Sequence, residues 1–381
     1  MVQNYIHNLQ NELKMGKQPY RILQVVTIMN RGGIETMIMN HYRTIDRSKY
    51  QFDFLVHRRE RGDYDDEIEQ LGGKIYRAFP IRPWKYPQYF NWLNKFFTSH
   101  CKYIAVHAHI QENSGLVFRI ARKYRINNLV STSHTAGYGI DYKYPFRLYA
   151  KYYLNKYCTH KMACGKMAGE HLYGKNVNFN LLHNAIDVSK FKYNISIRNR
   201  IRQELNIENK FVIGNVARFH KGKNHTFVID IFKEINNIDK NCCLVLVGDG
   251  EELEAIKYKV NSLNLNNNVK FLGVKNNVDE ILQAFDVLLF PSLFEGIPVS
   301  IIEAQASGLP CILSDTIDPE TAITKNVEYH SLNAPMSEWT NAILAKQNYR
   351  RRDTSTEIIE AGYDVIHNTE ILIDIYHPQN V

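Results

Sequence analysis

Short apolar runs alternate with amphipathic stretches along most of the chain. In the first half, each apolar run is long enough for a buried strand, and most runs are followed by a pattern with the period of a helix. The runs are Arg21–Ile28, Phe52–Val56, Lys74–Arg77, Tyr103–His107, Asn128–Thr132, His160–Ala163 and Asn178–Leu181. Strands that alternate with helices in this way predict a parallel sheet covered by helices on both faces.

The same pattern starts again in the second half. The second series of predicted strands is Lys210–Val216, Cys242–Val247, Val269–Leu272, Asp286–Phe290 and Pro310–Leu313. The segment Asp187–Asn206 lies between the two series and is predicted to be the linker. The fold class is therefore predicted to be α/β, with two Rossmann-like, doubly wound parallel-sheet domains. In such sheets ligands bind at the carboxyl ends of the strands, so we expect the chemistry in the loops that follow them.

Composition agrees with two ordinary globular domains. The chain has 381 residues, 44% hydrophobic and 23% charged, and each half is long enough to bury a core. No run approaches the roughly 18 apolar residues of a membrane span, and the first residues are polar, unlike a signal peptide. We therefore expect a cytoplasmic protein. Its cysteines form no CxxC pair or zinc spacing and are predicted to be reduced, buried small residues. They are Cys101, Cys158, Cys164, Cys242, Cys243 and Cys311.

The net charge of +8 is unevenly distributed. Residues 1–190 carry 28 Lys and Arg against 14 Asp and Glu, a net +14, whereas residues 191–381 carry 19 against 25, a net −6. An asymmetry of this size indicates that the first half meets an acidic surface. On charge alone, nucleic acid and anionic membrane are both candidates.

A loop and a predicted helix start follow the strand at Asp286–Phe290. The loop carries Phe294–Pro298, and the helix is predicted to begin at about Pro298, because proline suits the first helical turn. The free backbone N–H groups of Gly296–Val299 would then form an anion site that fits a diphosphate. Glu295 and Glu303 stand eight residues apart around this point. Two glutamates alone would be read as solvated loop and helix residues.

The surroundings of the two glutamates make the pattern specific. The stretch FPSLFEGIPVSIIEAQASGLP resembles the E-x7-E motif of the family 4 retaining glycosyltransferases, which have the GT-B fold. This resemblance implies two domains facing a central cleft that holds a nucleotide-sugar donor. It also implies that Glu303 accepts hydrogen bonds from a ribose diol and that Glu295 binds sugar hydroxyls.

The stretch GNVARFHKGKNH, Gly214–His225, is a second match to this family. The family has an arginine at a strand end and a lysine five residues later, which correspond to Arg218 and Lys223. Two cations in such a loop can neutralise a diphosphate as it becomes a leaving group. Lys221 is a nearby rival with a poorer spacing, and solvated basic residues are the alternative reading.

The stretch VSTSHTAG, Val130–Gly137, is a third match. In the family a histidine here points at the donor sugar and its phosphate, which implicates His134. His107 and His109 also stand at a strand end, and His109 is the weaker candidate. A lone histidine is more often a structural residue.

Glycines supply the remaining matches. The family places Gly32 and Gly33, in NRGGIE, beside the donor phosphate and the acceptor, and Gly248 begins a turn that resembles the family's VGDG. The backbone near Val274 would contact the base of the nucleotide. Asn184–Asp187 resembles a segment that precedes the linker in the family, with alanine in place of the usual glycine. The chain lacks GxGxxG, which argues against a dinucleotide oxidoreductase.

Together these matches imply a complete set of site residues. The implied catalytic residues are Glu295, His134, Arg218 and Lys223. The implied donor-binding residues are Gly32, Gly33, Arg218, Lys223, Gly248, Val274, Glu295, Gly296, Ile297, Pro298 and Glu303.

The resemblance covers about residues 21–376 and is greatest to transferases of bacterial capsule and exopolysaccharide assembly. It implies an acceptor-side domain at residues 1–188, completed by a crossover helix within 357–381, and a nucleotide-sugar domain at 189–356. The implied reaction transfers a sugar from a nucleoside-diphosphate donor, UDP favoured, to a saccharide acceptor that we expect to be lipid-linked, with retention of configuration, in bacterial surface polysaccharide synthesis. No Asp-x-Asp motif is present, so we expect no metal and no cofactor.

Other functions remain open at this point. A nucleotide-sugar epimerase of the same fold would need an acid/base set that the sequence does not arrange. A non-catalytic sugar-binding or partner-binding scaffold would not need the intact charged residues named above. Nucleic-acid binding lacks a recognition motif.

Two segments of the basic half mix aromatic and basic residues. They are Arg82–Phe97 and Lys143–Tyr157. Aromatic rings favour the headgroup region of a bilayer, and Lys and Arg attract anionic lipid. Both segments are therefore candidates for docking on the inner face of a membrane, with burial of the aromatics in the domain core as the alternative.

Overall fold

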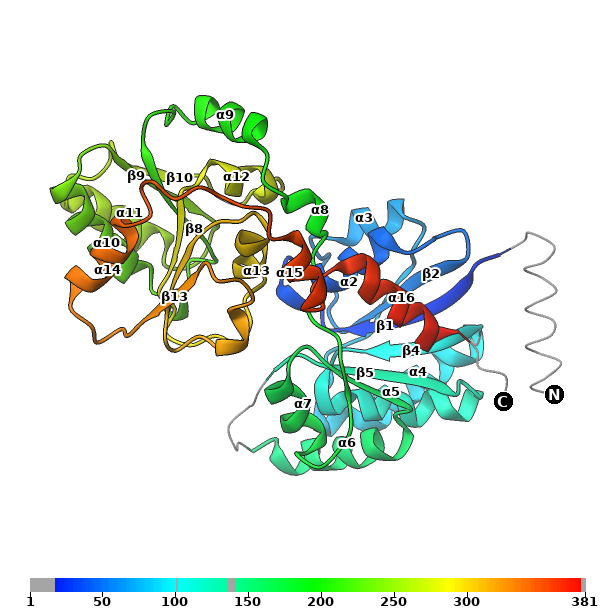
Figure 1. Cartoon of the computed structure of the whole chain (residues 1–381). Coiled ribbons are helices and arrows are strands. Elements are labelled where there is room, and N and C mark those ends of the chain that lie inside the picture. Colours follow the sequence, from blue (N-terminus) through cyan, green and yellow to red (C-terminus); the bar gives the residue numbers. More distant parts are fainter. Residues whose placement is uncertain (1–17, 101, 136–141, 378–381) are drawn as a thin grey trace. The chain divides into compact units, whose positions relative to one another are not determined.

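The computed structural model describes residues 18–100, 102–135 and 142–377 (Figure 1). The chain forms two compact units. Unit 1 comprises Met1–Ala185 and Val365–Val381, and unit 2 comprises Ile186–Asp364. Each unit is a parallel sheet with helices on both faces, as the alternation of apolar runs and amphipathic stretches predicts.

Unit 1 is built on a seven-stranded sheet in the order β3-β2-β1-β4-β5-β6-β7, with every pairing parallel. The central strands are almost fully buried, which is why they read as continuous apolar runs. The strands are β1 (Tyr20–Val26), β2 (Tyr50–Val56), β3 (Ile75–Arg77), β4 (Tyr103–Ala108), β5 (Asn128–Ser133), β6 (His160–Ala163) and β7 (Asn180–Leu181).

Helices pack two separate cores against the faces of this sheet. Apolar side chains of α2, α3 and α16 belong to one core, and those of α4, α5, α6 and α7 to the other. The helices are α2 (Gly33–Thr44), α3 (Asp65–Gln70), α4 (Tyr86–Ser99), α5 (Ser114–Ala121), α6 (Tyr144–Tyr157), α7 (Lys166–Tyr173) and α16 (Val365–Tyr376).

The last helix, α16, returns to unit 1 and lies beside α2 (Figure 1). Tyr376 is fully buried there and packs edge-on against Phe52 of β2, with ring centroids 6.0 Å apart. The return begins at Val365, later than the predicted residue 357, because Ile358 and Tyr363 are part of the core of unit 2.

Unit 2 has a six-stranded parallel sheet in the order β10-β9-β8-β11-β12-β13. Its strands are β8 (Phe211–Val216), β9 (Cys242–Val247), β10 (Val269–Phe271), β11 (Val287–Phe290), β12 (Cys311–Ser314) and β13 (Val327–His330). The edge strand β13 is only half-buried and was not anticipated from the sequence. Its helices are α8 (Val188–Phe191), α9 (Ile195–Glu204), α10 (His225–Ile238), α11 (Leu253–Ser262), α12 (Val278–Ala284), α13 (Val299–Ala306), α14 (Met336–Leu344) and α15 (Ser355–Glu360).

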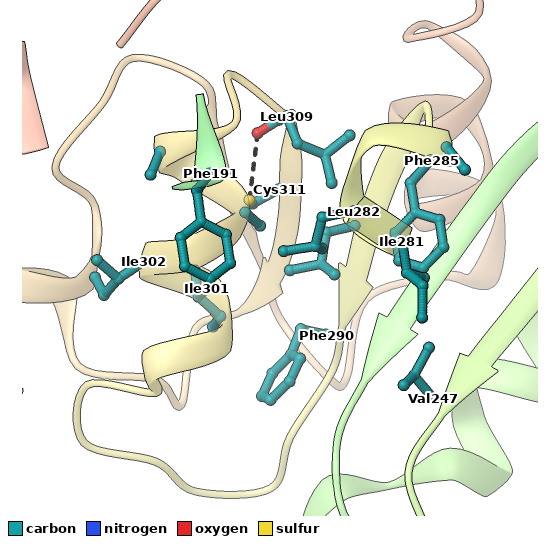
Figure 2. Close-up of a cluster of buried hydrophobic side chains, with 14 of the residues drawn as sticks. Phe191, Val247, Ile281, Leu282, Phe285, Phe290, Ile301, Ile302, Leu309 and Cys311 are labelled. Carbon is teal, nitrogen blue, oxygen red and sulfur yellow. Dashed lines mark hydrogen bonds between the residues drawn. The ribbon is translucent and has the colours of Figure 1, made fainter. Parts of the chain in front are cut away.

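Buried side chains from α8, α12, α13 and the sheet form one core of unit 2 (Figure 2). Phe191 of α8 and Phe290 at the end of β11 both belong to this core (Figure 2). The packing fixes the point where β11 ends and α13 begins, which is the loop that carries the Glu295 motif. The predicted linker at Asp187–Asn206 is thus folded as α8 and α9 and contributes to the core of unit 2.

The cysteines are partly as expected. Cys242, Cys243 and Cys311 are buried, Cys158 and Cys164 are half-buried, and all five are free thiols. Cys101 lies outside the described residues. None of the helices in the described part of the chain combines the length and apolarity that a bilayer crossing requires.

Candidate active site

In unit 2, two of the predicted site residues meet directly. Lys223 follows β8, Glu295 follows β11, and these two strands are neighbours in the sheet. Nζ of Lys223 lies 2.5 Å from Oε1 of Glu295, and each side chain is 22% exposed. The backbone N–H of Leu293 donates to the carbonyl of Gly222 at 2.8 Å, which ties the two loops together. A cation and a carboxylate are thus held side by side at the carboxyl edge of the sheet.

The other cations of the β8 loop are more exposed. Arg218 is 72% exposed and its Nη2 lies 3.3 Å from Oε2 of Glu251. Lys221 is exposed in the 3-10 turn Lys221–Lys223 that precedes α10. Of the two rival lysines, Lys223 is the one held against the Glu295 loop.

The helix after that loop begins slightly later than predicted. α13 starts at Val299, with Pro298 as its N-cap rather than in its first turn. Glu303 is therefore the fifth residue of α13. Its carboxylate has no hydrogen-bond or ion-pair partner in the part of the chain that the structure describes. Burial, reinforced by the charge of Asp279, raises the pKa of Glu303 to about 7.

Glycines let the other loops of this edge come together. Gly248 has a φ of +138°, and a Cβ there would lie 2.1 Å from the carbonyl oxygen of Ala217. The β9 loop can therefore approach the β8 loop only with glycine at this position. Gly296, by contrast, faces open space. Val274 is 59% exposed, and Ile297 packs against the core.

In unit 1, three histidines lie at the carboxyl ends of β4 and β5. Nε2 of His134 is 2.9 Å from Nδ1 of His109, and the ring centroids of His107 and His109 are 4.1 Å apart. Burial lowers the pKa of His134 to about 3 and holds the pKa values of His107 and His109 well below their usual range. All three rings are therefore neutral at physiological pH. Ala136 and Gly137, at the end of the predicted motif, lie outside the described residues.

The glycine pair stands at the start of α2 in the same unit. Gly32 is the N-cap of α2, and a Cβ there would lie 2.4 Å from Oε2 of Glu35. Gly33 faces open space, with nothing within 4 Å of a Cβ. Burial raises the pKa of Glu35. The N-terminal backbone of α2 is thus accessible at Gly33.

A pocket of about 920 Å³ opens at the same edge of the unit 1 sheet. Its lining includes His109, Thr135 and the exposed ring of Trp84. Gln111, also in the lining, has a φ of +53°, the left-handed region that is uncommon for residues other than glycine. Backbone in this conformation at a pocket wall is a frequent feature of binding sites.

Sequence reasoning missed the polar residues behind the histidines. Gln24 on β1 and Tyr376 on α16 are buried and hydrogen-bond to His109 and His107. The only available signal was a glutamine inside the apolar run RILQVV. No group of three or more His, Cys, Asp and Glu side chains with the geometry of a metal site occurs within residues 18–100, 102–135 and 142–377.

The two aromatic and basic segments behave differently. In α4, Tyr89, Leu93, Phe96 and Phe97 are buried in the core, so burial is the correct reading for these residues, whereas Trp84 before the helix is exposed. In α6, only Ala150 and Leu154 are buried. The exposed apolar residues of the α6 segment are Tyr142, Tyr144, Phe146, Leu148, Tyr149 and Tyr152.

Two parallel-sheet units of this kind, with charged and glycine-rich loops at the carboxyl edges of their strands, are the architecture of the GT-B fold. The sequence matches the family described as Glycosyltransferase Family 4 over residues 31–190 and that described as Glycosyl transferases group 1 over residues 197–346. The chain belongs to glycosyltransferase family 4.

Relatives and solved structures agree with this assignment. The putative glycosyltransferase EpsF of Bacillus subtilis (strain 168) is 34% identical over 375 residues, which are 95% of this chain and 98% of that protein. The capsular polysaccharide biosynthesis glycosyltransferase CapH of Staphylococcus aureus is 26% identical, with 93% of this chain and 98% of CapH covered. The crystal structure of Anabaena HepE in complex with UDP matches with a TM-score of 0.74 at 19% identity, over 93% of this chain and 98% of HepE. The chain is therefore a glycosyltransferase of the bacterial polysaccharide biosynthesis type.

Proposed function

We propose that the protein transfers a sugar from a nucleoside-diphosphate sugar, with UDP as the first choice of nucleotide, to a saccharide acceptor with retention of configuration. The observation that carries this proposal is the Lys223–Glu295 pair beside the start of α13, with the unpartnered carboxylate of Glu303 one turn into that helix. The cation and the free N–H groups can bind a diphosphate. The carboxylate can bind a diol. HepE, which has the same fold, was crystallised with UDP and with UDP-glucose.

Each residue has a distinct role in the proposed reaction. Arg218 and Lys223 hold the diphosphate and stabilise the charge that develops as its bond to the anomeric carbon breaks. Glu303 accepts hydrogen bonds from the ribose hydroxyls, and Glu295 accepts them from the sugar. Lys223 also holds the Glu295 carboxylate in place, since the two are already paired.

The proposed transfer step needs no nucleophile from the protein. As the anomeric carbon leaves the diphosphate, it bonds to the acceptor oxygen on the same face of the sugar. The proton of that acceptor hydroxyl passes to a phosphate oxygen of the leaving diphosphate. His134 takes part in binding the sugar, and the N-terminal backbone of α2 at Gly32 and Gly33 borders the phosphate and the acceptor. The charges on Arg218 and Lys223 and the start of α13 fill the role that a divalent metal plays elsewhere.

The acceptor is proposed to be a lipid-linked saccharide at the inner face of the cell membrane. An Escherichia coli relative, 27% identical over 294 residues, is named as a galactosyltransferase acting on a GlcNAc-diphosphoundecaprenol acceptor. The exposed aromatic residues of α6 stand among basic ones, which is the composition of a surface that binds anionic lipid. A hollow of about 440 Å³ adjoins this face and is lined by Arg119, Arg122, Lys123, Tyr152, Tyr153, Lys156 and Tyr157.

The test is turnover with a panel of nucleotide sugars in the presence of EDTA. The full chain is incubated with each donor, with and without short saccharide or polyprenyl-diphosphate saccharide acceptors, and products are identified by mass spectrometry. Slow donor hydrolysis without acceptor and glycoside formation with acceptor are expected, and the anomeric proton coupling of the product reports retention. Isomerised donor would indicate an epimerase, and no turnover of any donor would indicate a binding scaffold.

A further inference from the structure

A buried polar network extends behind His134 in unit 1. Nε2 of His109 lies 3.0 Å from the side-chain oxygen of Gln24, and Nδ1 of His109 lies 2.9 Å from Nε2 of His134. The side-chain NH₂ of Gln24 donates to the hydroxyl of Tyr376 at 3.3 Å. One chain of hydrogen bonds thus links β1, the residue after β4, the residue after β5 and helix α16.

The direction of these bonds follows from the chemistry of the groups. A neutral imidazole has one N–H donor and one lone-pair acceptor, and burial keeps these rings neutral. The oxygen of Gln24 only accepts, so Nε2 of His109 carries the proton and Nδ1 of His109 is an acceptor. The facing nitrogen of His134, Nε2, must then carry the proton and donate. The lone pair of His134 is left on Nδ1.

That remaining nitrogen has no partner of its own. Nδ1 of His134 is buried and makes no hydrogen bond to any of the described residues. Buried polar atoms without a partner are rare, and an unpaired N–H is rarer than an unpaired acceptor. The reversed orientation of the Gln24 amide would place an unpaired N–H at this position, so the orientation observed is the favourable one.

We propose that Gln24 is a positioning residue: through His109 it holds His134 in the tautomer protonated on Nε2, so that Nδ1 of His134 accepts a hydrogen bond from a sugar hydroxyl. A phosphate oxygen is itself an acceptor and cannot serve as that partner. This assigns His134 to hydroxyl recognition rather than to the phosphate. The inference rests on the proposed function, because sugar transfer is what brings a hydroxyl to this residue.

A second branch of the network provides a matched control. The hydroxyl of Tyr376 lies 2.5 Å from Nδ1 of His107, and Nε2 of His107 lies 2.7 Å from Oγ1 of Thr132. Thr132 is as buried as Gln24 and belongs to the same network, but among the described residues its side chain hydrogen-bonds to His107 and not to His109 or His134. Thr132→Val removes a buried hydrogen bond of similar kind without touching the bonds that orient His134.

The tautomers are measured directly by nitrogen-15 NMR of the full chain labelled at histidine. The signal of His134 is identified by its loss in His134→Asn. In the unliganded wild type we expect the proton on Nε2 of both His134 and His109. A proton on Nδ1 of His134 overturns the proposal. Because this measurement needs no turnover, its outcome is independent of whether the proposed function is correct.

The variants test whether Gln24 is the cause. Gln24→Met removes the acceptor that faces His109, so we expect the second tautomer of His134 to appear, whereas Thr132→Val should leave His134 unchanged. If circular dichroism shows that Gln24→Met does not fold, Tyr376→Phe replaces it, since it removes the hydroxyl that orients the Gln24 amide. An unchanged His134 in the folded variant overturns the proposal.

Kinetics then identify the source of the hydroxyl. Deoxygenated donors and deoxygenated acceptors are compared in the wild type and in Gln24→Met. Loss of the hydroxyl that meets His134 should lower wild-type kcat/KM by about three- to tenfold, the worth of one hydrogen bond, and should have little effect in Gln24→Met. If the difference appears with the deoxygenated donors, the hydroxyl belongs to the donor, and if it appears with the deoxygenated acceptors, the hydroxyl belongs to the acceptor. If both proteins respond alike to every deoxygenated compound, the proposal is wrong.

Discussion

If Glu303 binds the donor as proposed, it couples the stability of unit 2 to nucleotide-sugar binding, and we expect Glu303→Gln to separate the two. The pKa of Glu303 is raised from 4.5 to about 7 because burial removes water from its carboxylate and because Asp279 adds a nearby like charge. The neutral amide of glutamine has nearly the same shape and never pays this desolvation cost. We therefore expect the variant to be more stable than the wild type at pH 8 and to bind the donor more weakly.

The sign and size of the stability change follow from the pKa. Between pH 4.5 and about 7 the folded protein keeps a proton on Glu303 that the unfolded chain has lost. The free energy of unfolding therefore falls as the pH rises through this window and is level on either side of it. Each pKa unit corresponds to about 1.4 kcal/mol, so the ionised carboxylate costs at most about 3 kcal/mol above pH 7. Glu303→Gln should recover up to that amount.

The effect on binding has the opposite sign. The ionised carboxylate can accept two hydrogen bonds from a ribose diol, each worth about 1.5–3 kcal/mol when the acceptor is charged, whereas the amide oxygen is a weaker acceptor. The donor KM should rise by tenfold or more with little change in kcat, because the ribose contacts change little during transfer. Wild-type affinity should also strengthen as the pH rises through 7, and this dependence should vanish in the variant.

The assay combines urea unfolding and ligand binding between pH 5 and pH 8. Fluorescence of Trp339, which is fully buried in unit 2, reports on the unit that contains Glu303 once Trp84 and Trp92 of unit 1 are replaced by phenylalanine. UDP-glucose is the ligand, because its phosphates are both esterified and take up no proton near neutral pH. Glu254→Gln is the control, since Glu254 is 83% exposed and paired with Lys257. A Glu303→Gln protein that is less stable at pH 8, or that keeps the wild-type pH dependence, would refute the reasoning.

Three further expectations concern the leaving group, the metal and the membrane. Arg218→Ala and Lys223→Ala should each lower kcat/KM by roughly 10²–10³, whereas Lys221→Ala should have a mild effect. A large loss in Lys221→Ala with none in Lys223→Ala would show that the register of this loop is misassigned. UDP at 100 times its Kd should stabilise the protein by about 2.7 kcal/mol in thermal unfolding with EDTA present, and a strict need for a divalent ion would contradict metal-independent binding. The protein should sediment with anionic but not neutral liposomes, reversibly in high salt, and charge reversal at Arg147 and Lys151 should weaken this without changing UDP affinity. Equal sedimentation with both kinds of liposome would remove the membrane proposal.

The sheets were the most predictable part of the molecule. Buried parallel strands have apolar side chains on both faces, so β1, β2, β8 and β9 stand out as continuous apolar runs. The edge strand β13 is half-buried on both faces and carries Glu328 and His330, so it has no such signal. The strands that are buried on both faces could therefore be predicted from the sequence, and the half-buried edge strand could not.

The segment Asp187–Asn206 shows a different limit. Its helices are short and carry few apolar residues, which reads as a linker. The structure shows that Arg198 and Arg202 of α9 bind Asp286 at the start of β11, with Nη1 of Arg202 3.2 Å from Oδ2. The partner is more than 80 residues away, and no local pattern could reveal it.

Site residues were predictable where one sequence motif holds them and less so where several elements meet. Glu295 and Glu303 share a single loop and helix, so their spacing carried the information. The contact of Lys223 with Glu295 required knowing that β8 and β11 are neighbours, which strand order alone decides. The orientation of His134 depends on Gln24, a residue in an apolar run 110 positions earlier, and on the direction of hydrogen bonds that sequence does not encode locally.

Net charge and local charge carry different information in this chain. Residues 191–381 have a net charge of −6, yet they contain the loop proposed to hold a diphosphate. At physiological ionic strength, charges more than about 8 Å apart are largely screened, so we expect the proposed site to depend on Arg218, Lys223 and the start of α13 rather than on the total charge. The pairing of Lys223 with Glu295 reduces even this local charge in the unliganded protein. In the proposed reaction the diphosphate of the donor would meet Lys223 and its sugar hydroxyls would meet Glu295, so that each side chain exchanges its partner in the pair for a group of the donor.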